Sequence, residues 1–234
     1  MHVCILSIDT EAAIMGHTAV IAGATGLIGG ELIRCLLEDP FYDRVVALVR
    51  KETSWTHEKL VQVVTDYDEL EAVVKDYLPG SYVFCCLGTT IKKAGSKEQF
   101  RKVDYEYPML LGKLAFQYGA VDYLIVTAMG ANAGSAIFYN QVKGEIEEGL
   151  GKLRLPSLQI FRPSLLLGDR QEVRLGERFG AAVSRVITPI MIGGLRKYKP
   201  IKAETVAKAM LKSSKNSNKG TRIYESNQIE ELVK

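Results

Sequence analysis

Three glycines near the start of the chain have the spacing of a dinucleotide-binding loop. The stretch "VIAGATGLIGGELIRCL" contains GxxGxxG after a β-branched run and at the start of an amphipathic pattern. Glycine lets the backbone turn tightly and approach a pyrophosphate, which helix N–H groups and the helix dipole then hold. The strand–turn–helix context favours this over glycines that serve only helix–strand packing. The predicted cofactor-binding residues here are Gly23, Thr25, Gly26, Leu27, Ile28 and Gly29.

Two cations follow the second predicted strand and bear on the choice of cofactor. NAD sites usually place Asp or Glu at this position, about 20 residues beyond the glycine motif. Here the strand ends "ALVRKE", with Arg50 and Lys51 at the position. Arg can bind a 2′-phosphate through two donors at once, so NADP(H) is favoured over NAD. The alternative is an exposed basic pair at a strand end.

Tyr139 and Lys143 are four residues apart in "SAIFYNQVKGE". In a helix, side chains at this spacing project from the same face of one rigid element. The adjacent stripe is apolar, as in a packed helix, and consists of Phe138, Val142, Ile146 and Leu150. Taken alone, the pair also fits a half-buried tyrosine beside a lysine that keeps its ammonium in water.

The elements that must position these residues alternate between strand and helix patterns. Strands are predicted at 18–23, 44–49, 59–65, 81–88, 121–128, 157–168 and 221–226. Helices are predicted at 26–38 and 68–77, over 96–119 with a break at Pro108, around Tyr139, and at the end of the chain. This alternation predicts an α/β fold, a Rossmann-type doubly wound parallel sheet whose ligands bind outside the carboxyl ends of the strands.

The chain is expected to form a single domain. Residues 1–17 are interpreted as an N-terminal extension and residues 18–234 as the NAD(P)-binding domain. Residues 165–200 break the alternation with two glycine-rich points and one proline, so they are the candidate substrate or lid segment. Residues 212–220, "KSSKNSNKG", are predicted to be a polar surface loop before the last strand.

Five motifs occur in the same order as in a known family. They are "GATGLIGG", "CCLGTT", "VDYEYP", "YNQVKGE" and "FRPSLLLGDRQE". From about Thr18 to about Met210 the chain resembles the atypical short-chain dehydrogenase/reductase (SDR) family, and within it the Tat-interacting-protein oxidoreductase-like branch. The resemblance implies a Rossmann fold, NAD(P) as cofactor and oxidoreductase activity. Some atypical members bind NADP and act as regulators.

The resemblance also implies catalytic roles. Tyr139 matches the tyrosine that gives a proton to a carbonyl oxygen, or accepts it in the reverse direction. Lys143 matches the lysine that binds the nicotinamide ribose and lowers the pKa of the tyrosine. Thr127 stands where the family usually has serine, and would hydrogen-bond the substrate oxygen.

Further matches concern the cofactor. Leu87, Gly88 and Thr89 match the loop beside the cofactor ribose. Asp66 matches an adenine contact, and Pro163 matches the turn near the nicotinamide carboxamide.

Composition narrows the function classes. A net charge of +3, without basic clusters interleaved with aromatics, argues against nucleic acid as a partner. The three histidines are scattered and the four cysteines lack metal-ligand spacing, so no metal site is predicted. The chain shows neither a good secretory signal nor an apolar run long enough for a membrane span, and a cytoplasmic location is expected.

The favoured function is hydride transfer between NADP(H) and a small carbonyl or alcohol, with Tyr139 moving the proton. A second hypothesis is an NADP(H)-binding regulatory or redox-sensing protein with little catalysis. A third is an epimerase or dehydratase that keeps its cofactor bound, since it would use the same residues. The sequence does not identify the substrate, and a homodimer is favoured by base rate alone.

Overall fold

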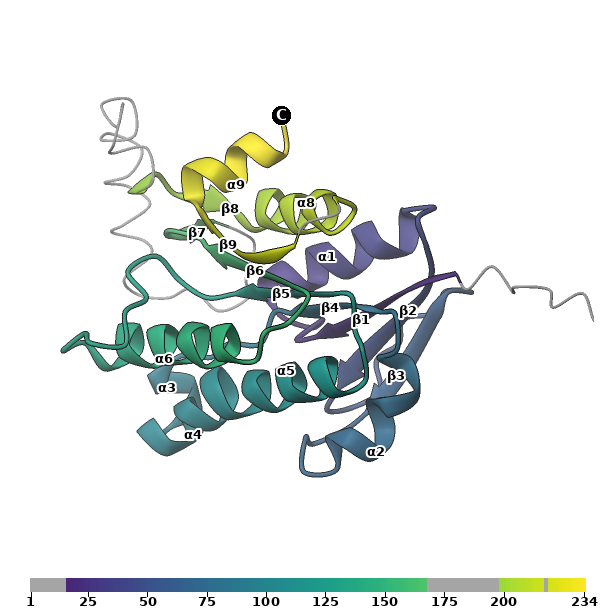
Figure 1. Cartoon of the computed structure of the whole chain (residues 1–234), viewed down its shortest axis with the longest axis horizontal. Helices are drawn as coiled ribbons and strands as arrows, with labels where there is room; N and C mark the ends of the chain where they lie inside the picture. The colour runs from purple at the N-terminus through teal and green to yellow at the C-terminus, as the bar shows by residue number, and fades with distance from the viewer. Residues whose placement is uncertain (1–15, 168–197, 217–218) are drawn as a thin grey trace, which may run out of the picture.

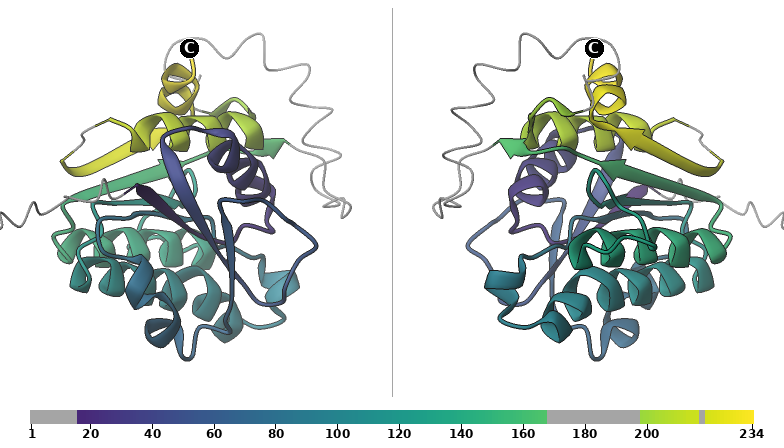
Figure 2. Two further views of the ribbon diagram at one scale, coloured as in Figure 1. Left: turned by 90° about the vertical axis from the view of Figure 1, so that its right-hand side faces the viewer. Right: turned by 90° about the vertical axis from the view of Figure 1, so that its left-hand side faces the viewer.

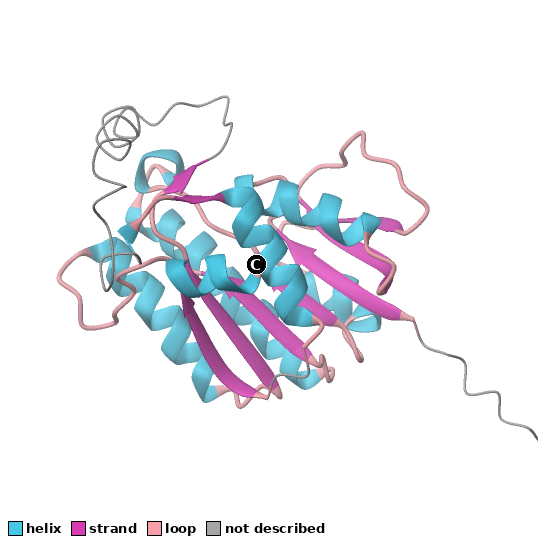
Figure 3. Cartoon of the chain, turned by 90° about the horizontal axis from the view of Figure 1, so that it is seen from above, coloured by secondary structure: helices cyan, strands magenta, loops and turns pink. Residues whose placement is uncertain are grey.

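The computed structural model describes residues 16–167, 198–216 and 219–234. Within them, seven parallel strands form one sheet in the order β3-β2-β1-β4-β5-β6-β9. Figure 3 shows these strands side by side. They are β1 (His17–Ala22), β2 (Tyr42–Val49), β3 (Leu60–Val64), β4 (Tyr82–Cys85), β5 (Asp122–Val126), β6 (Ser157–Arg162) and β9 (Gly220–Glu225). The predicted doubly wound α/β fold is therefore confirmed.

Helices cover both faces of the sheet (Figures 1 and 2). One face carries α1 (Leu27–Glu38), α8 (Ala203–Ser214) and α9 (Ser226–Leu232), and the other carries α2 (Leu70–Val74), α5 (Tyr107–Gln117) and α6 (Phe138–Lys152). The remaining elements are η1 (Lys75–Tyr77), α3 (Ile91–Ala94), α4 (Lys97–Arg101), the π-helix η2 (Lys102–Glu106) and the strand pair β7 (Leu166–Leu167) and β8 (Ile201–Lys202).

Strand β1 shows why this sequence makes a sheet that is buried on both faces. Ala19 and Ile21 pack into the core beneath α1 and α8, whereas Val20 and Ala22 pack into the core beneath α5 and α6. Successive side chains of a strand point to opposite faces, so a continuous apolar run fills two cores at once. The glycine motif begins where this strand ends.

The long helix predicted over 96–119 is interrupted, as expected near Pro108. Helix α4 passes into the π-helix η2, and α5 then begins at Tyr107 with Pro108 in its first turn. Proline is tolerated there because the first N–H groups of a helix have no partner within the helix. The interruption therefore falls before the proline, in the five residues Lys102–Glu106.

The predicted surface loop over 212–220 is partly wrong. Helix α8, which the sequence analysis did not predict, continues to Ser214, and both Ser213 and Ser214 are buried. The Ser214 hydroxyl lies 2.7 Å from the Tyr42 hydroxyl, and the Ser213 hydroxyl donates to Gln159. These serines look like loop residues in the sequence, but hydrogen bonds to buried side chains hold them inside.

The order of the strands places the ligand site. The chain runs outward from β1 through β2 to β3, then returns to the middle and runs through β4, β5 and β6 in the other direction. Ligands of such sheets bind at the carboxyl edge where the order reverses, between β1 and β4. Most of candidate segment 165–200 and most of extension 1–17 lie outside the described residues.

Candidate active site

The glycine loop follows β1 and lies against the loop that follows β4. Gly23 has φ +84°, and a Cβ on it would lie 2.6 Å from the carbonyl carbon of Cys86. The Gly26 N–H donates to the Gly23 carbonyl at 3.0 Å, and the Cys86 N–H donates to the Ala22 carbonyl at 2.8 Å. Only glycine fits at position 23, because both the positive φ and the neighbouring backbone exclude a side chain.

The third glycine lets α1 begin directly over this turn. A Cβ on Gly29 would lie 2.1 Å from the Gly23 carbonyl oxygen. Gly26 is the N-cap of α1, no side chain caps the helix, and its first turn contains no acidic residue. The first N–H groups of α1 therefore remain available to an anion, which is how a helix N-terminus holds a pyrophosphate.

The residues predicted to contact the adenosine end lie at the same edge of the sheet. Arg50 and Lys51 follow β2 and are exposed, and Asp66 follows the neighbouring strand β3 and is also exposed. Among the described residues, neither Arg50 nor Lys51 takes part in an ion pair. Two free cations near an expected ribose can bind a phosphate without first giving up a partner.

The apolar stripe predicted for α6 faces the core, with Phe138 half-buried and the other three residues buried. Val142, Ile146 and Leu150 are buried, and Lys143 on the adjacent stripe is also buried, with 4% of its surface exposed. Tyr139 is half-buried, and its ring centroid lies 5.8 Å from that of Phe100. The aromatic contact fixes the ring while leaving part of the side chain accessible.

Lys143 is paired with Asp104, a residue that the sequence analysis did not single out. The Lys143 Nζ lies 2.8 Å from the Asp104 Oδ1, and the side chains are only 6% and 0% exposed. Burial is the largest single effect on the pKa of Lys143 and lowers it, but the charge of Asp104, the charge of Tyr139 and the hydrogen bond to Asp104 together outweigh burial and raise the pKa. Lys143 therefore stays protonated in the interior.

Asp104 is positioned by the π-helix η2. Its second carboxylate oxygen accepts the Thr89 N–H at 2.9 Å, so the same side chain holds Lys143 and the loop after β4. π-Helical turns occur often at functional sites because they redirect a side chain. Asp104 lies within the motif "VDYEYP", but nothing in that motif marked this acidic residue as the partner of Lys143.

The loop after β4 touches both halves of the site. Its residue Cys86 lies against Gly23, while a Cβ built on Gly88 would lie 3.8 Å from the Lys143 Nζ. Leu87 is half-buried between them, and Gly88 itself is exposed. The stretch Cys86–Gly88 therefore leads from the glycine loop toward Lys143, the lysine predicted to be catalytic.

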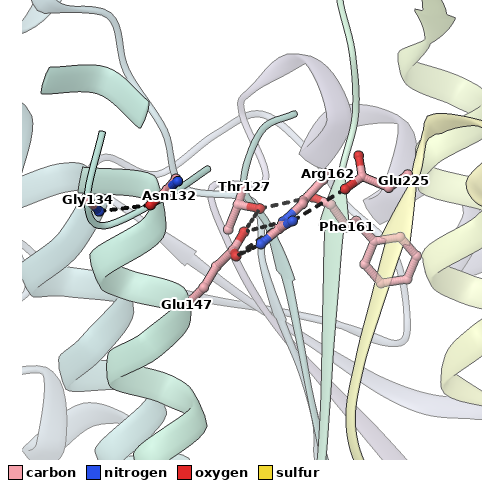
Figure 4. A network of polar contacts seen from close by, with 7 residues as sticks. All are labelled: Thr127, Asn132, Gly134, Glu147, Phe161, Arg162 and Glu225. Carbon is pink, nitrogen blue, oxygen red and sulfur yellow. Dashed lines mark hydrogen bonds and ion pairs between the residues drawn. The ribbon is translucent and has the colours of Figure 1, made fainter. Parts of the chain in front are cut away.

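The Thr127 hydroxyl is committed to another partner. It donates to the Glu147 Oε1 at 2.6 Å, and it lies 3.4 Å from the Phe161 carbonyl (Figure 4). The threonine is buried, with 5% of its surface exposed. The sequence analysis expected this hydroxyl to donate to a substrate oxygen, and in this arrangement its proton is already used.

Glu147 and Arg162 were not predicted as part of the site. The Arg162 Nε and one terminal nitrogen donate to the Glu147 carboxylate at 2.5 to 3.2 Å, and the other terminal nitrogen lies 3.3 Å from Glu225 (Figure 4). Glu147 is four residues beyond Lys143, which continues the stripe that begins at Tyr139. The spacing could have suggested it, but Arg162 and Glu225 are distant in sequence.

Pro163 joins the carboxyl ends of β5 and β6. It is buried, and its carbonyl accepts the Met129 N–H at 3.0 Å. The predicted contact with the nicotinamide carboxamide would be made from this fixed turn.

The comparisons with known proteins agree with this geometry. Residues 19–225 match the model of the NAD dependent epimerase/dehydratase family. The chain belongs to this family. It is 32% identical over 176 residues to protein HTATIP2 of Rattus norvegicus, covering 74% of this chain and 72% of that protein. The resemblance to the Tat-interacting-protein branch of the atypical SDR family is thereby confirmed.

A fungal relative and two solved structures extend the comparison. Protein FMP52-1, mitochondrial, of Scheffersomyces stipitis is 31% identical over 230 residues, covering 93% of this chain and 99% of that protein. The structure of MoeE5 with UDP-glucose and NAD superposes with TM-score 0.67 at 14% identity, covering 91% and 79% of the two chains. UDP-glucose 4-epimerase of Thermotoga maritima gives 0.65 at 16% identity, covering 92% and 81%. At such identities the structures support the fold alone.

The cytoplasmic location expected from the sequence is contradicted by the fungal relatives, which are named as mitochondrial proteins. The expectation was based on the lack of a good secretory signal and of a long apolar run. Neither observation distinguishes a cytoplasmic protein from a mitochondrial one. In the described part of the chain, every helix is too short or too polar to cross a bilayer.

Proposed function

We propose that this protein is an NADP(H)-dependent oxidoreductase that acts on a carbonyl or alcohol through Tyr139 and Lys143. One observation carries the proposal. The loop after β4 packs against the glycine loop at Cys86, and its Thr89 N–H donates to Asp104, the carboxylate that is paired with Lys143. A dinucleotide whose pyrophosphate lies on the α1 N-terminus would have its nicotinamide half directed along this loop toward α6.

The residues present fit such a cofactor. The glycine loop is packed too tightly for a Cβ at Gly23 or Gly29, the first turn of α1 has no acidic residue, and Arg50 and Lys51 are unpaired within the described residues. These two cations favour a 2′-phosphate and therefore NADP(H). The family description refers to NAD, and MoeE5 was solved with NAD, so the preference for NADP(H) rests on this chain's own residues.

Each catalytic residue has one task in this proposal. When bound, NADPH supplies the hydride that reaches the carbonyl carbon. Tyr139 gives its hydroxyl proton to the carbonyl oxygen, which becomes the alcohol. Lys143 would bind the nicotinamide ribose and hold a positive charge on the same face of α6 as Tyr139. Asp104 keeps Lys143 charged and in place.

Replacing Tyr139 with phenylalanine tests the proposal. Turnover of NADPH with a carbonyl panel should fall by about 10²- to 10⁴-fold, the usual contribution of a proton donor, while NADPH affinity changes little. Tyr118→Phe is the matched control, because that hydroxyl binds Glu71 on α2 and lies far from α6 in sequence. Equal turnover in the Tyr139 variant and in the wild type would remove Tyr139 from the mechanism.

A second candidate is an NADP(H)-binding regulatory protein with little turnover. The observation that favours it is the Thr127 hydroxyl, whose proton is donated to Glu147. With the Thr127 proton donated to Glu147, Tyr139 is the one remaining hydroxyl donor among the described residues that were predicted to be catalytic. Tight NADPH binding, with no Tyr139-dependent turnover across the panel, would favour this candidate over the oxidoreductase.

A further inference from the structure

The cation at the end of β6 is already neutralised. Arg162 lies between Glu147 and Glu225, with only 22% of its side chain exposed (Figure 4). Its contacts with Glu147 use both the Nε and a terminal nitrogen, the two-point geometry in which arginine binds a carboxylate most strongly. With two carboxylates and one guanidinium, this cluster carries one net negative charge. We call these three residues the Arg162 cluster.

In the described part of the chain, a second buried ion pair at this edge is also complete. Lys143 is paired with Asp104, and the Thr127 hydroxyl donates to Glu147 in the Arg162 cluster. An anionic substrate held beside α6 and β6 would therefore have to displace a carboxylate from a formed ion pair. Breaking a buried pair is costly because it leaves a charge without a partner.

Apolar side chains are exposed on the loops that follow β4, β5 and β6. Ile91 begins α3 and is 42% exposed, and Ile137 immediately precedes α6 and is 62% exposed. Leu165 and Leu167 follow β6 and are each 36% exposed. All four lie beyond carboxyl ends of strands, the edge where ligands of this fold bind. Exposed apolar side chains beside polar groups that are already paired with one another are typical of a site for an apolar ligand.

We infer that the substrate is a neutral, apolar aldehyde, ketone or alcohol, and that compounds carrying a carboxylate or phosphate are rejected. This inference rests on the proposed oxidoreductase function. The Arg162 cluster rejects anions by its net charge, and the exposed apolar residues favour hydrocarbon. Specificity of this kind arises as much from repulsion of the wrong ligand as from attraction of the right one.

Matched carbonyl pairs test the inference. The probes are 4′-methylacetophenone against 4-acetylbenzoate, and decanal against 10-oxodecanoate, with NADPH as reductant. In each pair the neutral member should have a kcat/KM at least about tenfold higher, which corresponds to about 1.4 kcal/mol. Equal values, or preference for the anion, would overturn the inference.

A binding measurement distinguishes an error in the inferred ligand class from an error in the proposed oxidoreductase function. Each probe is titrated into the NADP⁺ complex and followed by calorimetry. Neutral probes that bind without turnover would refute the oxidoreductase and leave the ligand class standing. Anions that bind as tightly as their neutral partners, or no binding by any probe, would refute the ligand class.

A charge variant tests whether the Arg162 cluster is the cause. Glu225→Gln removes one negative charge and keeps an oxygen that can cap α9, where Glu225 is the N-cap. The preference for neutral probes should fall about tenfold, or about 1.4 kcal/mol. Glu231→Gln, an equal charge change at an exposed position of the same helix, should leave the preference unaltered. An unchanged preference in the Glu225 variant would show that the cluster does not select the substrate.

Discussion

Lys143, which the sequence predicted from its spacing to Tyr139, depends for its charge on Asp104, which the sequence did not predict. A lysine alone at this depth would tend to lose its proton, because burial disfavours the charged form. Asp104 reverses this and raises the pKa of Lys143. The lysine could be predicted because it lies four residues from Tyr139 on one helix. Its partner could not, because η2 is over thirty residues away and its π-helical turn has no clear sequence pattern.

At the adenosine end, Arg50 carries the prediction of cofactor choice. Arg50→Glu should weaken NADPH binding by at least about tenfold, since a hydrogen bond to a charged group contributes about 1.5–3 kcal/mol. NADH binding should change much less. Calorimetric titration of both cofactors measures this. Arg44→Glu, the same change near the amino end of β2, is the control. Equal losses for NADPH and NADH would show that Arg50 does not bind the phosphate.

The first turn of α1 provides an element-scale test with two adjacent glycines. A Cβ at position 29 would lie 2.1 Å from the Gly23 carbonyl oxygen, whereas one at position 30 would lie 3.7 Å from the Ala24 carbonyl oxygen, an ordinary contact. Gly29→Ala should therefore displace α1 from the loop and abolish tight NADPH binding. Gly30→Ala should retain binding and stabilise the helix by up to about 1 kcal/mol. Normal NADPH affinity in the Gly29 variant would contradict the packing described for this turn.

Helix α6 offers a second pair of glycines. A Cβ on Gly144 would lie 2.1 Å from the Ala133 N and 2.2 Å from the Asn132 carbonyl carbon, but one on Gly151 would meet nothing within 4 Å. Gly144→Ala should cost about 1–3 kcal/mol of unfolding free energy, the usual effect of overpacking. It should also lower turnover, because α6 carries Tyr139 and Lys143. Gly151→Ala should do neither. Thermal unfolding and kinetics of both variants check this, and identical behaviour would refute the close approach of α6 to residues 132–133.

The elements themselves were largely predictable from the sequence, and the exceptions have physical reasons. Continuous apolar runs rich in β-branched residues located the seven strands of the main sheet, and helical apolar patterns located α1 and α6. Helix α8 was missed because its last turn ends in serines whose hydrogen bonds are made to Tyr42 and Gln159, residues far away in the chain. Contacts of that kind leave no local pattern.

On the scale of the whole molecule, the two edges of the sheet differ in chemistry. The candidate active site lies at the carboxyl edge, whereas Asp122 is the first residue of β5 at the amino edge, beside a cavity of about 180 Å³. Asp122 is buried, and burial raises its pKa from 3.8 to about 6, although a hydrogen bond from Gln159 lowers it in part. The folded protein therefore binds this proton more tightly than the unfolded chain.

This raised pKa predicts a measurable dependence of stability on pH. The raised pKa of Asp122 adds to the free energy of unfolding. This stabilisation is greatest below about pH 4 and is lost as pH rises through about 6. Asp122→Asn should therefore gain stability relative to the wild type over that window, on the order of 2 to 3 kcal/mol by pH 7. NADPH binding should be unaffected because the site is at the opposite edge. Urea unfolding at several pH values measures the difference, and a difference independent of pH would contradict the prediction.

The central claim is that the carboxyl edge between β1 and β4 holds NADP(H). Calorimetric titration of the purified protein with NADPH and with NADH, at one salt concentration, tests it most directly. The account predicts tight binding of NADPH and at least about tenfold weaker binding of NADH, a difference of about 1.4 kcal/mol or more. Binding of neither cofactor would contradict it, and would mean that Gly23, Gly26 and Gly29 serve only to pack α1 against the sheet.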